Sequence, residues 1–190
     1  MKSIIAVIIA FFTLLTSGHG GTTGDPVDPT DVPRVMMFTM HNNWAWGIQQ
    51  SVMVIDSDGN CYLQYTDNSN HDYNYGNMPD GWIDLKEDGW YEKLVEITET
   101  GEYINTFTEN ANLIRNNVGN FESWGKLPVK EYNDGCCDYG VNTLYGVYYA
   151  EGGMGLTELA CVGDAMECRD SKEVMKFVNG TGLMSMKKFT

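Results

Sequence analysis

Three tyrosines and a histidine carry the strongest chemical signal in this sequence. His71, Tyr73 and Tyr75 lie in a segment rich in Asn, Asp and Gly, and Tyr62 lies in a predicted strand before it. An aromatic ring offers a flat apolar face for stacking, while neighbouring Asn and Asp side chains fix the orientation of a ligand. We therefore predict that these four residues line a shallow groove for a carbohydrate or an extended peptide.

The tryptophans near this segment have a different interpretation. Trp44 and Trp46 lie at the start of the first predicted hairpin, at 44–66, and Trp90 recurs with apolar residues at helical spacing. Large aromatic side chains at such positions are typical of the contact between a sheet and a helix. We expect all three to pack in the core.

The chain has five cysteines, and disulfides are the default pairing in an exported protein. Cys161 and Cys168 enclose a short loop that closes readily, so we predict a bridge between them. Cys61 is predicted to bridge to Cys137 or to its neighbour Cys136. Because five is an odd number, one thiol is left over.

A thiol-dependent enzyme is the catalytic alternative. Nucleophilic catalysis needs a base beside the nucleophile, and Cys137, His71 and Asp138 supply the three residue types. Nothing in their spacing requires them to meet. We therefore expect no catalytic residues.

The spacing of the acidic, cysteine and histidine residues does not match known metal or cofactor motifs. Residues 56–60 alternate oxygen side chains as the start of an EF-hand loop does, but the glycine stands in the fourth position instead of the sixth. The adjacent Cys136 and Cys137 do not match paired zinc ligands. Phosphate-loop and zinc-protease motifs do not occur. We expect neither a metal nor a cofactor.

The charge balance restricts the partners. Lysine and arginine total 12 against 26 acidic residues, which gives a net charge of −14. Because phosphates need cationic contacts, this balance opposes binding to nucleic acid or to an anionic membrane surface. The expected partner is an extracellular ligand or protein whose identity the sequence does not reveal.

The N-terminus has the composition of an export signal. Lys2 is followed by an apolar run at 4–15 and by small residues at 17–21, so residues 1–20 are predicted to be a signal peptide. Residues 21–33 are Gly, Thr, Asp, Val and Pro and read as a flexible linker. A single domain is expected at 34–190. The mature protein is predicted to be secreted and extracellular, with no membrane insertion after cleavage.

The elements that must position these residues begin with one hairpin. Asp56 opens a predicted type I turn, and Gly59 closes it in the left-handed conformation. The turn sets the register, because a slip of one residue would exchange the two faces. The core face is predicted to include Cys61, and the outward face Tyr62. The predicted cross-strand pairs are Ile55 with Cys61, Met53 with Leu63, and Ser51 with Tyr65.

Other segments complete the predicted domain. A strand at 34–40 precedes this hairpin, and a second hairpin pairs 142–150 with 156–162. Residues 121–133 are expected to be connecting chain. Apolar residues at helical spacing predict helices near 84–97, 106–119 and 170–180. The expected fold class is α+β: an antiparallel sheet of about five strands, built from two hairpins and covered on one face by two or three helices.

Three short motifs support a resemblance. Asn-Trp-Ala-Trp-Gly at 43–47, Asp-Ser-Asp-Gly-Asn at 56–60, and Cys-Asp-Tyr-Gly at 137–140 before the tyrosine-rich strand at 145–149 occur in this order. The arrangement resembles uncharacterised secreted proteins and lipoproteins of Gram-positive bacteria over most of 35–178. The chain departs from them because it lacks the cysteine that anchors a lipid. The resemblance implies a fold and an extracellular location but no activity.

Three classes of function therefore remain open. The favoured one is a secreted, non-catalytic binding or interaction module. A secreted hydrolase or thiol-dependent enzyme is the second, and a structural or inhibitory envelope protein is the third. Exposed aromatics around one groove favour the first class, an unbridged cysteine close to a histidine favours the second, and a protruding disulfide loop favours the third.

Overall fold

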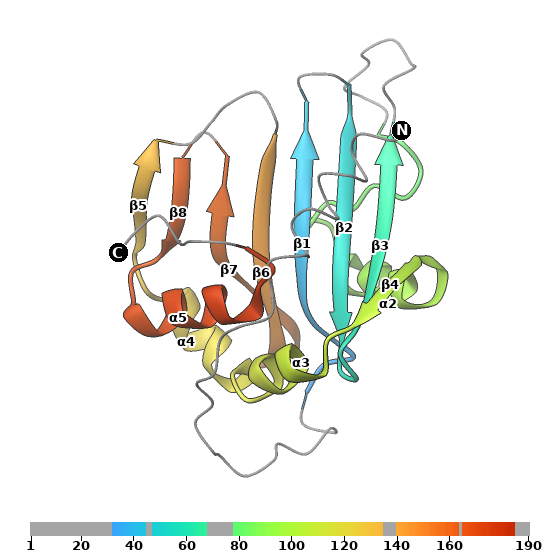
Figure 1. Ribbon diagram of the computed structural model, residues 1–190. Helices are drawn as coiled ribbons and strands as arrows, with labels where there is room; N and C mark the ends of the chain where they lie inside the picture. The colour runs from blue at the N-terminus through green and yellow to red at the C-terminus, as the bar shows by residue number, and fades with distance from the viewer. Residues whose placement is uncertain (1–31, 45–46, 68–77, 135–139, 164, 185–190) are drawn as a thin grey trace.

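The computed structural model describes residues 32–44, 47–67, 78–134, 140–163 and 165–184 (Figure 1). The predicted signal peptide and most of the predicted linker lie outside these residues. Val32 and Pro33, at the end of that linker, are buried.

The strands form one antiparallel sheet in the order β4-β3-β2-β1-β6-β7-β8-β5. In chain order they are β1 (Val35–Asn43), β2 (Gln49–Asp56), β3 (Asn60–Asp67), β4 (Glu102–Thr106), β5 (Val129–Asp134), β6 (Val141–Ala150), β7 (Gly153–Val162) and β8 (Ala165–Arg169). The helices are α2 (Trp90–Thr100), α3 (Thr108–Arg115), the 3-10 turn η2 (Val118–Asn120), α4 (Phe121–Gly125) and α5 (Lys172–Thr181).

The first hairpin has the predicted register. Ile55 pairs with Cys61, and the pairing continues to the end of β3 without a shift. The Gly59 amide donates to the Asp56 carbonyl at 3.1 Å, and Gly59 has a φ of 88°. The Asp56 carboxylate also accepts hydrogen bonds from the main-chain amides of Asp58 and Asn60. The tight turn from Asp56 to Gly59 and its left-handed glycine are thus confirmed.

The second hairpin is also confirmed, with a tighter turn than expected. Ala150 pairs with Gly153, so only Glu151 and Gly152 connect β6 to β7. β7 therefore begins three residues earlier than predicted. Gly152 has a φ of 89°, a conformation that glycine adopts without steric cost.

The prediction of about five strands is wrong, because β4, β5 and β8 extend the sheet to eight strands. β1 and β6 pair, which joins the two predicted hairpins within this sheet. β4 and β8 were not predicted, and β5 lies in a segment that was expected to be connecting chain. β4 and β5 are the two edges, and both are short and mostly polar. A strand of this kind is specified by its partner more than by its own apolar pattern.

Helices cover both faces of the sheet, so the prediction of one covered face is also wrong (Figure 1). The consecutive residues Val54 and Ile55 are both fully buried but belong to different cores. Val54 packs on the α2 side with Leu94 and Ile97. Ile55 packs on the side of α3, α4 and α5, where Phe121 is also fully buried. The class remains α+β.

The helices match their predictions unevenly. α5 begins after Ser171, whose hydroxyl accepts from the Glu173 amide, and it buries Phe177 as expected. α2 begins at Trp90 after a left-handed Gly89, and Asp84 instead forms a separate turn with Glu87. Within the described residues, no helix combines the length and the apolar character that spanning a membrane requires.

Candidate functional site

The predicted tyrosine groove is only partly within the described residues. Tyr62 lies on β3, is half-buried, and meets the ring of Tyr103 edge to face at 5.9 Å between centroids. Burial is the main cause that raises the pKa of Tyr62 above its usual value. His71, Tyr73 and Tyr75 lie outside the described residues, so their role in binding stays a prediction.

A nearby segment, 78–89, is held against the sheet by one buried amide. The side chain of Gln50 donates to the Ile83 carbonyl at 3.0 Å and accepts from the Ile83 amide at 2.8 Å. Gln50 is 1% exposed and Ile83 is 2% exposed. Gln50 therefore satisfies both main-chain groups of Ile83, much as a neighbouring strand would.

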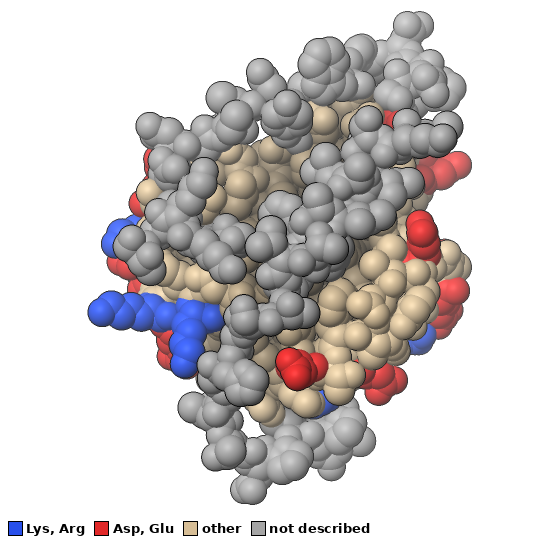
Figure 2. All heavy atoms as spheres, in the orientation of Figure 1, with Lys and Arg blue, Asp and Glu red and all other residues tan. Residues whose placement is uncertain are grey.

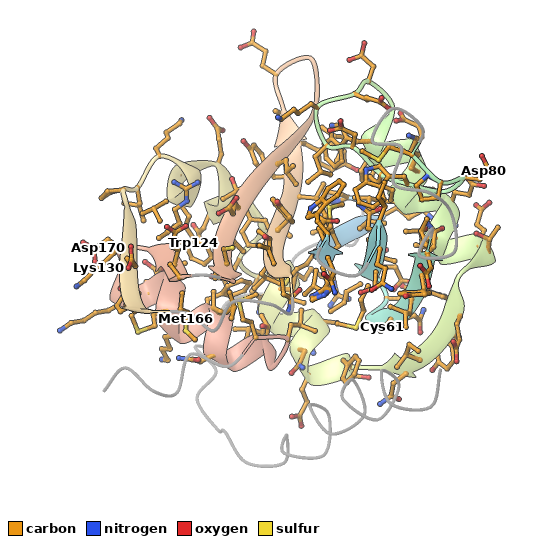
Figure 3. All side chains as sticks on the ribbon, turned by 90° about the horizontal axis from the view of Figure 1, so that it is seen from above. Cys61, Asp80, Trp124, Lys130, Met166 and Asp170 are labelled. Carbon is orange, nitrogen blue, oxygen red and sulfur yellow. The ribbon has the colours of Figure 1, made fainter. Side chains whose placement is uncertain are left out.

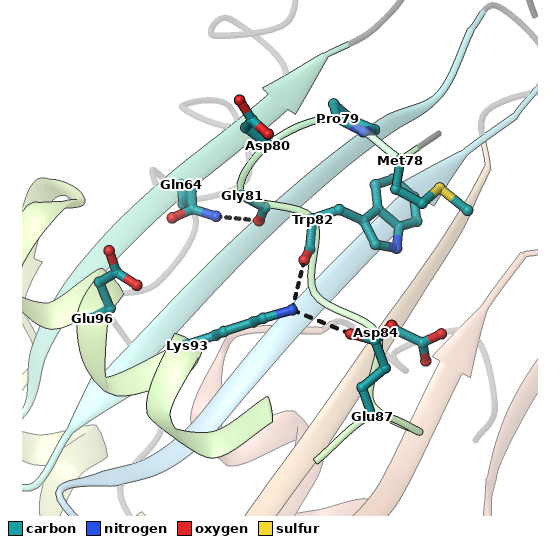
Figure 4. A pocket seen from close by; sticks show the side chains of 10 residues that line it. All are labelled: Gln64, Met78, Pro79, Asp80, Gly81, Trp82, Asp84, Glu87, Lys93 and Glu96. Carbon is teal, nitrogen blue, oxygen red and sulfur yellow. Dashed lines mark hydrogen bonds and ion pairs between the residues drawn. The ribbon is translucent and has the colours of Figure 1, made fainter. Parts of the chain in front are cut away.

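A second contact fixes the turn just before Ile83. The Trp82 amide donates to the Pro79 carbonyl at 3.1 Å, and Gly81 has a φ of 85°, as the third residue of a type II turn requires. The side-chain amide of Gln64 donates to the Gly81 carbonyl at 2.8 Å (Figure 4). These contacts hold the segment over the end of β3.

An open pocket of about 450 Å³ lies between this segment, β3 and α2 (Figure 4). It is lined by Gln64, Met78, Pro79, Asp80, Gly81, Trp82, Asp84, Glu87, Lys93 and Glu96. A volume of this size falls within the range of small-ligand sites, roughly 300 to 1,000 Å³. Figure 3 shows Asp80 pointing outward, at the edge of the molecule opposite to Lys130 and Asp170.

Tryptophan rings provide the apolar surface beside the pocket. Trp82 lines the pocket, and its ring packs against that of Trp44 with 5.2 Å between the ring centroids. Trp44 is 40% exposed and Met78 is 44% exposed. The prediction that Trp44 packs in the core is therefore wrong. Trp90 does pack against the core on the α2 side, and Trp46 lies outside the described residues.

The charged residues of the pocket are mostly acidic. The lining includes four carboxylates and the single ammonium of Lys93. The Lys93 Nζ donates to the Trp82 carbonyl at 3.3 Å and to the Glu87 carboxylate at 3.4 Å. Among the described residues, neither Asp80 nor Glu96 forms an ion pair. The pocket therefore offers an unbalanced negative charge beside an aromatic surface.

The predicted disulfide between Cys161 and Cys168 is not formed, since both residues carry free thiols. Cys161 on β7 pairs with Glu167 of β8, whereas Cys168 pairs with Ala160. The two cysteines are thus one step out of register, and their side chains point to opposite faces of the sheet. Cys168 is buried in the core, and Cys161 accepts a hydrogen bond from the Thr143 hydroxyl at 3.6 Å.

Cys61 is a free, buried thiol as well, so the predicted bridge from Cys61 is not formed either. Cys136 and Cys137 lie outside the described residues. Burial raises the pKa of Cys61 to about 12 and that of Cys168 to about 11. Burial also raises the pKa of Cys161. Because the thiolate is the reactive form, these three thiols are poor nucleophiles at neutral pH.

The segment that resembles an EF-hand loop serves the hairpin turn. The Asp56 carboxylate accepts from two main-chain amides and from the Asn60 side chain at 3.0 Å. In the part of the chain that the structure describes, no three His, Cys, Asp or Glu side chains form a group that can hold a metal ion.

The residues that surround the pocket were not predicted from the sequence. Pro79-Asp80-Gly81 is nevertheless a recognised turn signal. That signal indicates a fixed chain direction just before Trp82. The sequence does not reveal that Gln50, far away in the chain, anchors Ile83, the residue after Trp82.

Comparisons with known proteins do not add to this picture: no family model, curated protein or solved structure matches the chain. The predicted resemblance to secreted proteins of Gram-positive bacteria therefore stays a prediction.

Proposed function

We propose that this chain is a secreted, non-catalytic binding module whose ligand lies in the pocket beside Trp44 and Trp82. The observation that carries the proposal is the tryptophan pair itself, because Trp44 is exposed and packs on Trp82, which lines an open pocket. Exposed aromatic surface next to a concavity is typical of sites for carbohydrates and extended peptides.

The polar groups of the pocket support the same function. Gln64, Asp80 and Glu96 come from β3, the 78–89 segment and α2, and all three line the same pocket. Aromatic faces supply contact area, and polar groups at defined positions select and orient the ligand. A binding module needs no more chemistry than this.

The enzymatic alternative has less support. Each of the three described thiols has a pKa that burial raises, which works against a thiolate nucleophile. The constellation drawn from Cys137, His71 and Asp138 lies outside the described residues. An inhibitory role based on a protruding disulfide loop loses its basis, because residues 161–168 lie mainly on the paired strands β7 and β8.

The location outside the cell rests on the N-terminal sequence. Lys2 and the apolar run at 4–15 precede a set of small residues, which is the composition of a cleaved export signal. Secreted material is expected to lack about 18 to 20 N-terminal residues. N-terminal sequencing that found intact Met1 on exported protein would count against this part of the proposal.

The binding site is tested by Trp44→Ala in a screen of oligosaccharides and short peptides. Loss of one stacking ring is expected to weaken binding of any hit roughly tenfold. The matched control is Tyr65→Ala, because Tyr65 is 47% exposed and lies on the opposite face of β3 from Gln64. Both variants are expected to melt close to the wild type, since exposed residues contribute little to folding.

Two results would argue against the proposal. The first is that the Trp44→Ala variant binds a hit as tightly as the wild type and Tyr65→Ala do, because the ligand would then lie elsewhere. The second is turnover of a hit by the wild-type protein, which would point to an enzyme.

A further inference from the structure

The segment 78–89 and the helix α2, which form most of the pocket lining, are strongly acidic. Residues 80–99 include seven acidic and two basic residues. Acidic side chains gather on the side of the molecule where α2 and β4 lie (Figure 2). A surface of one sign attracts ligands of the opposite sign and speeds their association.

The pocket already holds an ammonium group from its own chain. The Lys93 Nζ is bound by a main-chain carbonyl and by the Glu87 carboxylate, at 3.3 and 3.4 Å. These are long contacts, and the side chains of Lys93 and Glu87 are 40% and 64% exposed. The walls therefore present the acceptor types that bind an ammonium, in a site that is open to solvent.

Carboxylates remain for a second cation. Asp80 and Glu96 approach the pocket from two different elements, and neither is ion-paired among the described residues. Trp82 also lines the pocket, and a cation over a tryptophan face gains further attraction. A neutral sugar would use the rings but would leave these charges unbalanced.

We propose that this pocket binds a lysine or arginine side chain of a basic, extended peptide segment. The inference rests on the proposed binding function and specifies its ligand. The cationic group lies between Asp80 and Glu96, and its aliphatic stem packs on Trp82. The exposed ring of Trp44 contacts a neighbouring side chain of the same peptide, which a small free amine does not supply.

The test is calorimetric titration of the full-length secreted protein with four probes. Hexalysine is the cationic peptide, spermine is a free polyamine, chitohexaose is a neutral oligosaccharide, and hexaglutamate is an acidic peptide. Hexalysine is expected to bind most tightly and to weaken as salt is added, because exposed charges are screened. Hexaglutamate is expected not to bind.

A pair of double variants separates the pocket from the overall charge. Asp80→Asn with Glu96→Gln removes two charges from the pocket. Glu151→Gln with Glu173→Gln removes two from the exposed β6–β7 turn and from α5. The pocket variant is expected to bind hexalysine roughly tenfold more weakly than the wild type. The control variant is expected to stay within about twofold of the wild type.

Each other result overturns the inference in a distinct way. Equal loss in both double variants would mean that only net charge attracts the probe. Spermine binding as tightly as hexalysine would mean that the site takes free amines. Chitohexaose binding that depends on Trp44, without hexalysine binding, would refute the cationic ligand and leave the binding function standing. Binding of no probe, together with no hit in the wider screen, would remove both proposals.

Discussion

The side-chain amide of Gln50 pairs with both main-chain groups of Ile83, with hydrogen bonds of 2.8 and 3.0 Å in the interior of the protein. The same amide nitrogen also donates to the Asn42 side chain at 3.1 Å. One residue of β2 thus determines where the segment that forms the pocket wall meets the sheet. The position of the pocket wall depends on this contact even though Gln50 is not among the residues that line the pocket.

Replacing Gln50 by Leu is expected to destabilise the protein by about 3 kcal/mol, because it leaves the buried amide and carbonyl of Ile83 without partners. Urea unfolding measures the change. The control is Gln64→Leu, which removes an exposed hydrogen bond to Gly81 and is expected to cost about 0.5 kcal/mol or less. Equal losses for the two variants would contradict the anchoring role of Gln50.

Gly59→Ala is expected to destabilise the first hairpin by about 2 kcal/mol or more. Gly59 has a φ of 88°, and an added Cβ would lie 2.6 Å from the Cβ of Ala111 in α3. The left-handed conformation alone costs a non-glycine residue about 1 kcal/mol, and the overlap with α3 adds to it. Ser57→Ala, two residues earlier in the turn, is the control and is expected to be nearly neutral. Thermal and urea melting of both variants gives the comparison.

The thiols of Cys61, Cys161 and Cys168 are expected to react with a thiol reagent only after unfolding. All three are free, and burial raises the pKa of each. A variant with Cys136→Ser and Cys137→Ser isolates their signal, so that thiols titrated before and after adding urea can be counted directly. Rapid reaction in the folded state, or a bridged Cys161–Cys168 fragment in mass mapping, would contradict the arrangement of β7 and β8.

Glu158→Gln is expected to raise the melting temperature at pH 7. Burial raises the pKa of Glu158, and the nearby charges of Arg169 and Glu167 act in opposite directions on it. The folded state therefore favours the protonated carboxyl, so this contribution to stability is present below the ordinary glutamate pKa and is lost as the pH rises through the raised pKa. Glutamine mimics the protonated form at every pH.

The pH series provides the check on Glu158. The gain from Glu158→Gln should be largest at pH 7 and should vanish below about pH 4, where the wild-type carboxyl is protonated too. Glu151→Gln, in the exposed turn between β6 and β7, is expected to leave the melting temperature unchanged. A gain that does not depend on pH would mean that packing, instead of charge, limits stability at this position.

The site was harder to predict than the hairpins. The tyrosines and histidine at 62–75 form a conspicuous cluster in the sequence, but Tyr62 packs partly against Tyr103. Trp82 and Trp44, which the structure places together, are far apart in the chain. Local composition identifies clusters of residues that are adjacent in the sequence, whereas the pocket is formed by residues that are distant in the sequence and adjacent in the folded structure.

Two parts of the fold follow from local sequence. Asp56 and Gly59 determine the first turn, and that turn sets the register from Ile55–Cys61 onward. Ser171 and the spacing of Val174 and Phe177 determine α5. In each case the relevant interactions join residues within one hairpin or one helix, so turn chemistry and apolar period are sufficient to predict them.

Only the tertiary structure decided how these parts combine. The pairing of β1 with β6 joins two hairpins into a single sheet, and packing on both faces separates Val54 and Ile55 into different cores. The register of β7 and β8 placed Cys161 and Cys168 on opposite faces. Such choices depend on contacts between distant segments, and the short polar strands carry too little local preference to reveal them.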